Sequence, residues 1–168
     1  MNTQTILKPG LCFILLGLLV FSGCSANTYG VRKVEFSDPQ APGQDETSIF
    51  VFRENSAFGA ARKFAIVCND TVMGVLNAGT FCHFNVKSAE NEIVAYMTGP
   101  IMHYRVQDHP GQTLYLYCKM GYASGMFIKE ISEGKAKKFM NEFKYTEIDV
   151  KGKKTKINYK DYYDKLFQ

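Results

Sequence analysis

Cysteine and histidine are the side chains of this 168-residue chain that could carry reactive chemistry, with five cysteines and three histidines. Together they could bind zinc, but the sequence has no C-x-x-C pair and no H-E-x-x-H motif, so we expect no metal site. Cys68 or Cys118 could act as a nucleophile beside His103, which would make the protein a hydrolase or thiol enzyme. Ser124 lacks the leading glycine of a G-x-S-x-G nucleophile turn. We therefore predict a protein without catalytic residues or cofactor and keep the cysteine–histidine enzyme as the alternative.

Cys24 follows a segment with the composition of a secretory signal. One lysine precedes an apolar run over residues 11–21, and Ser22-Gly23 places small residues before the cysteine. Residues 18–24 resemble the lipobox of bacterial lipoproteins, with Phe21 where leucine is usual. The resemblance implies cleavage between Gly23 and Cys24, acylation of the Cys24 thiol and attachment to a lipid bilayer. A permanent spanning helix is the weaker interpretation, because the run is shorter than the ~20 residues that such a helix needs.

The expected location limits the class of partner. By resemblance to enterobacterial sorting, Ser25 after the cysteine favours the outer membrane, with the protein facing the periplasm. Removal of residues 1–23 leaves enough chain for one domain. The formal net charge of +4 is too small to suggest a nucleic-acid partner. We expect a lipid-anchored protein of the bacterial cell envelope whose further partner is an envelope protein or a glycan.

The elements that must position these side chains are short strands. Residues 24–47 contain two prolines and no periodic apolar pattern, which predicts a tether. Residues 48–144 predict a mainly β domain, an antiparallel β-sandwich of about seven to eight short strands with a C-terminal amphipathic helix over residues 133–144. The expected strands are the Val-, Ile-, Phe- and Tyr-rich runs 48–53, 63–68, 72–76, 80–86, 91–97, 101–106, 112–118 and 125–131.

Two expected turns assign the cysteines to sheet faces. Asn69-Asp70 suits a two-residue hairpin, and residues 77–79 suit a three-residue loop with glycine in the left-handed position. If both turns connect neighbouring strands, Cys68 shares one face with Ile66, Met73 and His83, opposite to a core face formed by Val67, Val72, Leu76, Cys82, Phe84 and Val86. This arrangement excludes a Cys68–Cys82 disulfide. A Cys82–Cys118 disulfide is the better pairing, and buried free thiols are the alternative.

Two regions could form an interaction surface. Arg53, at the end of the first expected strand, could bind an anionic ligand, or its side chain could simply be solvated. Residues 145–168 are a lysine-rich extension with aromatic residues at three- and four-residue spacing: Tyr159, Tyr162, Tyr163 and Phe167. This spacing fits an interfacial helix against lipid or a partner, but a terminal helix folded back on the sandwich, which buries the same aromatic residues, is the favoured interpretation.

Several apolar motifs extend over more than half of the chain. They are Ile49-Phe50-Val51-Phe52-Arg53, Gly59-Ala60-Ala61, Val67-Cys68-Asn69-Asp70-Thr71-Val72-Met73-Gly74-Val75-Leu76, Ala78-Gly79-Thr80-Phe81 and Leu114-Tyr115-Leu116-Tyr117. From Ile49 to about Phe143 the chain thereby resembles the bacterial lipoproteins grouped as domain-of-unknown-function family twenty-eight forty-six. Residues 88–91 depart from the Pro-Gly turn expected there. The resemblance implies a fold and a location but no mechanism, so we expect a non-catalytic binding or envelope-interaction module.

Overall fold

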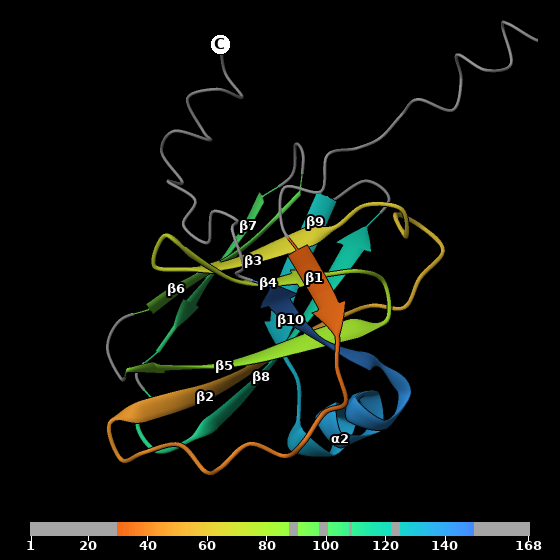
Figure 1. Cartoon of the computed structure of the whole chain (residues 1–168). Helices are drawn as coiled ribbons and strands as arrows, with labels where there is room; N and C mark the ends of the chain where they lie inside the picture. The colour runs from red at the N-terminus through yellow and green to blue at the C-terminus, as the bar shows by residue number, and fades with distance from the viewer. Residues whose placement is uncertain (1–29, 88–90, 98–100, 108, 122–124, 150–168) are drawn as a thin grey trace, which may run out of the picture.

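The computed structural model describes residues 30–87, 91–97, 101–107, 109–121 and 125–149, and in it two β-sheets face each other (Figure 1). The eight expected strands are confirmed as β2 to β9, and the expected helix as α2. The elements are β1 Gly30–Lys33, β2 Glu46–Arg53, β3 Phe64–Cys68, β4 Thr71–Leu76, β5 Thr80–Lys87, β6 Asn91–Tyr96, β7 Ile101–Val106, β8 Thr113–Gly121, β9 Gly125–Glu130, α2 Glu133–Glu142 and β10 Lys144–Asp149.

The two sheets form the predicted sandwich. One sheet has the strand order β1-β10-β5-β2-β8-β9, and the other has the order β4-β3-β6-β7. Most neighbouring strands are antiparallel, but β10 runs parallel to β5 and β2 runs parallel to β8. These two parallel pairs bring strands that are distant in the sequence to the centre of the larger sheet.

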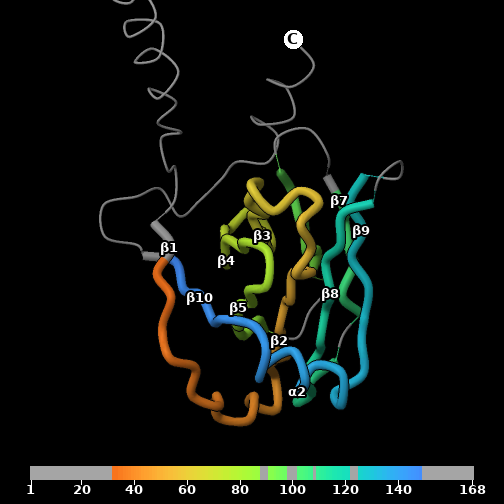
Figure 2. The backbone as a smooth tube through the Cα atoms, turned by 90° about the vertical axis from the view of Figure 1, so that its right-hand side faces the viewer, coloured from red at the N-terminus to blue at the C-terminus, as the bar shows by residue number. Residues whose placement is uncertain are grey.

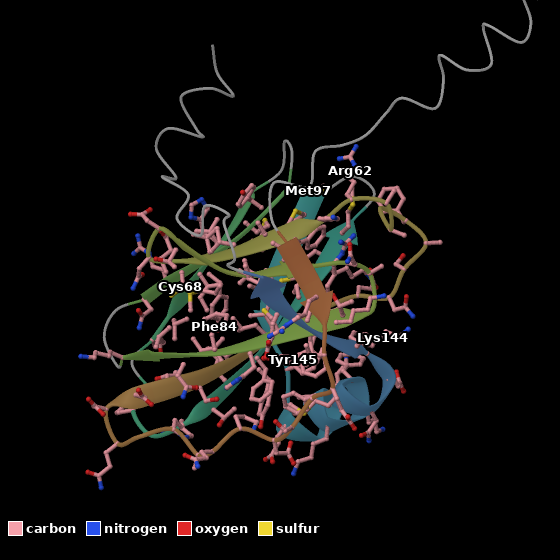
Figure 3. All side chains as sticks on the ribbon, viewed as in Figure 1. Arg62, Cys68, Phe84, Met97, Lys144 and Tyr145 are labelled. Carbon is pink, nitrogen blue, oxygen red and sulfur yellow. The ribbon has the colours of Figure 1, made fainter. Side chains whose placement is uncertain are left out.

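Apolar side chains pack in two layers, one between the sheets and one outside the larger sheet. Ile49 and Val51 of β2 face the inter-sheet core, where Figure 3 also places Cys68 and Phe84. Phe50 and Phe52 alternate to the outer face, as expected for a strand of period two. There α2 covers part of the sheet through Ala136 and its neighbouring aromatic residues. The larger sheet is therefore apolar on both faces around β2.

The folded domain is longer at both ends than the sequence predicts. Residues 30–47 are not a tether, because β1 pairs with β10 and Phe36 packs edge-on against Phe50 and Phe81. At the other end, residues 145–149 belong to β10 and not to a separate extension. Both strands were missed because β1 is a short, charged edge strand and β10 alternates too weakly to stand out. The backbone ladder between them joins residues 115 positions apart, such as Arg32 and Glu147.

The predicted assignment of sheet faces is wrong for part of the core. The Asn69-Asp70 turn is confirmed, with φ values of 45° and 63°. Gly79 is also left-handed, with φ 66°, but β4 and β5 lie in different sheets and do not form a hairpin. A register shift between Ile66 and Val67 further changes the pairing of β3 with β4. As a result Ile66 and Cys68 face the inter-sheet core, and Val67 belongs to a separate cluster with Val72, Val75 and Val94.

Candidate functional site

A pocket of about 680 Å³ opens on the outer face of the larger sheet, between α2 and the segment that follows β1. We call it the outer pocket. Its floor is sheet, with Ser48 and Phe50 from β2 and Thr113 and Tyr115 from β8. Its walls are residues 36 and 38–42 on one side and Lys137, Met140 and Asn141 of α2 on the other. Aromatic rings, hydroxyls and amides therefore meet in one concave site, as in many small-ligand sites.

Strand alternation explains why polar groups line this floor. Ser48 is the outward-facing residue preceding Phe50 in β2, and Thr113 occupies the equivalent place before Tyr115 in the parallel strand β8. Ser48 and Thr113 are register partners, so their side chains lie side by side on the same face. None of these residues was predicted as functional. Every second residue from Ser48 in β2, and from Thr113 in β8, is polar first and then aromatic. This pattern could have indicated the site, but only once β2 and β8 are known to pair.

A hydrogen bond joins the pocket floor to a histidine. The Ser48 hydroxyl lies 2.8 Å from Nε2 of His83, and the His83 ring stacks at a tilt on Phe50 with 4.5 Å between ring centroids. Burial lowers the pKa of His83, and a side-chain hydrogen bond with Asn85 partly opposes this shift. The imidazole is therefore neutral near pH 7 and holds the Ser48 hydroxyl in a defined orientation.

This arrangement predicts a pH dependence of stability. Because folding favours neutral His83, the unfolded state binds more protons than the folded state once the pH falls below the unfolded pKa of about 6.5. The contribution of His83 to stability is complete above that pH and is lost as the pH falls toward the lowered pKa of the folded state. Urea titrations between about pH 7.5 and pH 5 should therefore show stability falling with acidification, with a shallower fall for His83→Gln. Equal slopes for the two proteins would contradict this prediction.

Arg53 is not an interaction surface. Its side chain is buried between the sheets, with a relative exposure of 3% for the residue, and donates hydrogen bonds to the carbonyl oxygens of Gly59, Arg62 and Leu76. The guanidinium carbon also lies 3.9 Å from the centroid of the Phe64 ring. Desolvation lowers the pKa of Arg53 to about 10, so the group remains charged near pH 7. Its inward direction follows from strand alternation, since it lies two residues beyond Val51 on the core face of β2.

Cys68, Cys82 and Cys118 are buried and free, so the possible Cys82–Cys118 disulfide is not formed and the alternative of buried free thiols is confirmed. Cys82 and Cys118 lie on β5 and β8, the two strands that flank β2. Two strand spacings separate their backbones by about 10 Å, which exceeds the reach of a disulfide. Burial raises the pKa of Cys68 to about 11 and that of Cys118 to about 12, and it raises the pKa of Cys82 as well. Thiolate chemistry is therefore disfavoured at all three positions.

The proposed cysteine–histidine pair does not come together. Tyr104 and Met102 of β7 pack against the inter-sheet core, so His103 between them points to the opposite face. There its Nδ1 lies 3.1 Å from a carboxylate oxygen of Glu92. Cys68 and Cys118 both face the core. The smaller sheet thus separates His103 from both thiols that could have acted as its nucleophile.

The remaining predicted site residues lie outside the described residues: Gly23 and Cys24 of the cleavage and lipidation site, and Tyr159, Tyr162, Tyr163 and Phe167. Within the described ranges, no group of three or more histidine, cysteine or acidic side chains could hold a metal ion. In the same part of the chain, no helix combines the length and the apolar character needed to cross a bilayer.

The chain was compared with known protein families and with curated proteins. No protein-family model matches the chain, and no curated protein matches it. The sequence and the geometry of the outer pocket are therefore the basis on which a function can be inferred.

Proposed function

We propose that this protein is a lipoprotein of the bacterial cell envelope, anchored through acylated Cys24 to the outer membrane and facing the periplasm. It is a non-catalytic binding module, and its sandwich domain is related to the domain-of-unknown-function lipoproteins that the sequence resembles. The signal-like segment before Cys24 supports the anchor. The outer pocket supports the binding role.

The composition of the outer pocket carries the proposal and favours a glycan as ligand. Tyr115 is partly exposed and offers an apolar ring face, which suits the C–H faces of a sugar ring, while Phe50 is buried in the floor of the pocket. Thr113 and Asn141 are exposed and offer hydroxyl and amide groups, which suit its hydroxyl or acetamido substituents, whereas the buried Ser48 hydroxyl is already hydrogen-bonded to His83. The ligand class that matches this mixture is a short oligosaccharide.

The position of the outer pocket in the domain fits this role. β1 begins at Gly30 on the edge of the larger sheet and runs towards α2, so its start is the end of the strand farther from the helix in both Figure 1 and Figure 2. A domain anchored through Cys24 would therefore hold the outer pocket on the side away from the bilayer. In that position an envelope glycan could reach it.

Binding of N-acetylglucosamine oligomers of two to four units, measured by saturation-transfer NMR and calorimetry, tests the proposal. We expect a Kd of about 0.1 mM or tighter. Replacing Tyr115 with alanine should weaken binding about tenfold or more, because the pocket then loses a ring face. Lys137→Ala and Lys138→Ala form a matched pair, since both lysines lie exposed on α2 but only Lys137 lines the pocket.

The outcomes of this experiment are distinct. Weaker binding by Tyr115→Ala and Lys137→Ala, with unchanged binding by Lys138→Ala, supports the outer pocket as the glycan site. Binding that survives both pocket variants, or no binding of the oligomers by a protein whose circular dichroism is native, would overturn the glycan proposal.

A further inference from the structure

Lysines and aromatic rings lie side by side on the outer face of the larger sheet, at its β8–β9 edge. Cys118 of β8 and Ile128 of β9 are register partners that face the inter-sheet core, so the residues on either side of each point outward. The outward residues form two cross-strand pairs, Tyr117 with Lys129 and Lys119 with Phe127. Rings and ammonium groups therefore alternate on two neighbouring strands.

A third lysine comes from α2. Nζ of Lys135 lies 5.5 Å from the centroid of the Tyr117 ring, and Nζ of Lys119 lies 5.9 Å from that of Phe127. We call Tyr117, Lys119, Phe127, Lys129 and Lys135 the lysine–aromatic patch. It shares no residue with the lining of the outer pocket.

The lysine–aromatic patch carries a net positive charge. A carboxylate oxygen of Glu54 lies 3.6 Å from Nζ of Lys119, so this acid compensates one of the three lysines. Lys129 and Lys135 are exposed, and neither forms an ion pair with a residue that the structure describes. Two uncompensated charges therefore face solvent and attract anions.

Phe127 supplies a ring that the core does not use. Its side chain is partly exposed, and it belongs to none of the apolar clusters that the described residues form. Tyr117 instead packs with the cluster beneath α2 and stacks on Phe139. The Phe127 ring can therefore contact the C–H face of a sugar while the neighbouring lysines contact its charged groups.

We propose that the lysine–aromatic patch binds an anionic polysaccharide of the cell envelope. Protein interfaces are depleted in lysine and enriched in arginine, and the patch has no arginine, so a protein partner is disfavoured. β9 and β1 are the opposite edges of the larger sheet, as Figure 2 also shows. A domain anchored before β1 thus holds the patch away from its point of attachment, which favours a polymer over lipid headgroups. This preference rests on the proposed anchor, and the patch is a different surface from the outer pocket.

Titration of hexagalacturonate, which carries a carboxylate on each sugar, into the full chain purified in detergent tests the inference by calorimetry. We expect a Kd of about 0.1 mM at about 0.05 M salt, and binding about tenfold weaker at about 0.5 M salt, because salt screens exposed charges. The methyl-esterified hexamer keeps the sugar rings without the charges and should bind about tenfold more weakly.

Two variants remove the two parts of the patch. Combining Lys119→Gln, Lys129→Gln and Lys135→Gln should weaken binding about tenfold or more. Phe127→Ala should weaken it about fivefold, and the fold should be retained because the ring lies outside the apolar clusters.

The matched control combines Lys33→Gln, Lys87→Gln and Lys144→Gln. These lysines are exposed on β1, β5 and β10, so the variant removes the same charge from the other half of the sheet. It should leave the Kd within about twofold. Tyr115→Ala, which alters the outer pocket, should also leave hexagalacturonate binding unchanged.

The outcomes separate this inference from the proposed function. Loss of binding in both patch variants, with binding kept in both controls, supports the lysine–aromatic patch. Equal weakening by the two triple variants, weakening by Tyr115→Ala, equal binding of the methyl ester, or no binding by a natively folded protein would overturn it. Equal affinity for a hexaglutamate peptide would assign the patch to an acidic protein partner and overturn the polysaccharide. The N-acetylglucosamine oligomers test the outer pocket independently of these results.

Discussion

Replacing Arg53 with methionine is expected to lower the free energy of unfolding by about 3 kcal/mol or more. The carbonyl oxygens of Gly59, Arg62 and Leu76 would lose their guanidinium donors, and a buried polar group without a partner costs about 1–3 kcal/mol. The stacking of the cation on the Phe64 ring would also be lost. Urea unfolding followed by circular dichroism measures the change.

The same contacts predict a local effect. Arg53 ties two carbonyls of the loop between β2 and β3 to the end of β4, so methionine at position 53 should also release this loop. Trypsin cleavage after Lys63, which is exposed at the end of that loop, should become faster. Arg53→Lys should have an intermediate effect, because one ammonium group cannot reproduce the planar arrangement of donors.

Arg62→Met is the matched control for Arg53→Met. The Arg62 side chain is exposed and approaches the Met97 sulfur only at 4.0 Å, so its loss should change stability by about 0.5 kcal/mol or less. Unchanged stability of Arg53→Met, or equal losses in the two variants, would contradict the structural role of Arg53.

Replacing Gly74 with alanine is expected to cost about 2 kcal/mol of stability, because β4 and β5 approach each other there without room for a methyl group. A Cβ atom at position 74 would lie 2.5 Å from the Cys82 sulfur and 2.9 Å from the Cys82 Cβ. Both distances are shorter than real carbon contacts, so the two sheets would have to move apart at this corner. Thermal unfolding followed by circular dichroism measures the loss.

A double-mutant cycle identifies the contact responsible. Cys82→Ala removes the sulfur but not the Cβ, so Gly74→Ala should cost less in the Cys82→Ala background than in the wild-type protein. Gly134→Ala is the control, since no atom lies within 4 Å of its added methyl group and alanine favours the helix by up to about 1 kcal/mol. Strictly additive effects of the Gly74 and Cys82 substitutions would show that they do not interact.

The sequence predicts most strands and the helix correctly because those patterns are local. Alternation of β-branched and aromatic residues predicts β2 to β9, and the turn residues Asn69 and Asp70 predict the hairpin between β3 and β4. The spacing of Ala136, Phe139 and Met140 predicts α2. Each of these signals lies within one element or one tight turn. The positions of these elements in the sandwich depend on contacts between segments that are distant in the sequence.

The candidate site could not be predicted from local patterns, because its residues come from different strands. Ser48 and Thr113 lie 65 positions apart and become neighbours only because β2 and β8 pair in parallel. His83 joins them from β5 on the other side of β2. The wall formed by residues 36 and 38–42 looked like part of a tether, since nothing local indicates that Phe36 packs on the sheet.

By itself, the amino-acid sequence determined strands β2 to β9, the helix, the tight turn at Asn69-Asp70 and the chemistry expected of the segment around Cys24. Only the tertiary structure decided that Arg53 is buried, that the thiols of Cys82 and Cys118 stay apart, and that an outer pocket exists. The physical reason is that side-chain alternation states which residues share a face within one strand. Which strands become neighbours depends on backbone hydrogen bonds and packing between distant segments, and these interactions leave no local pattern in the sequence.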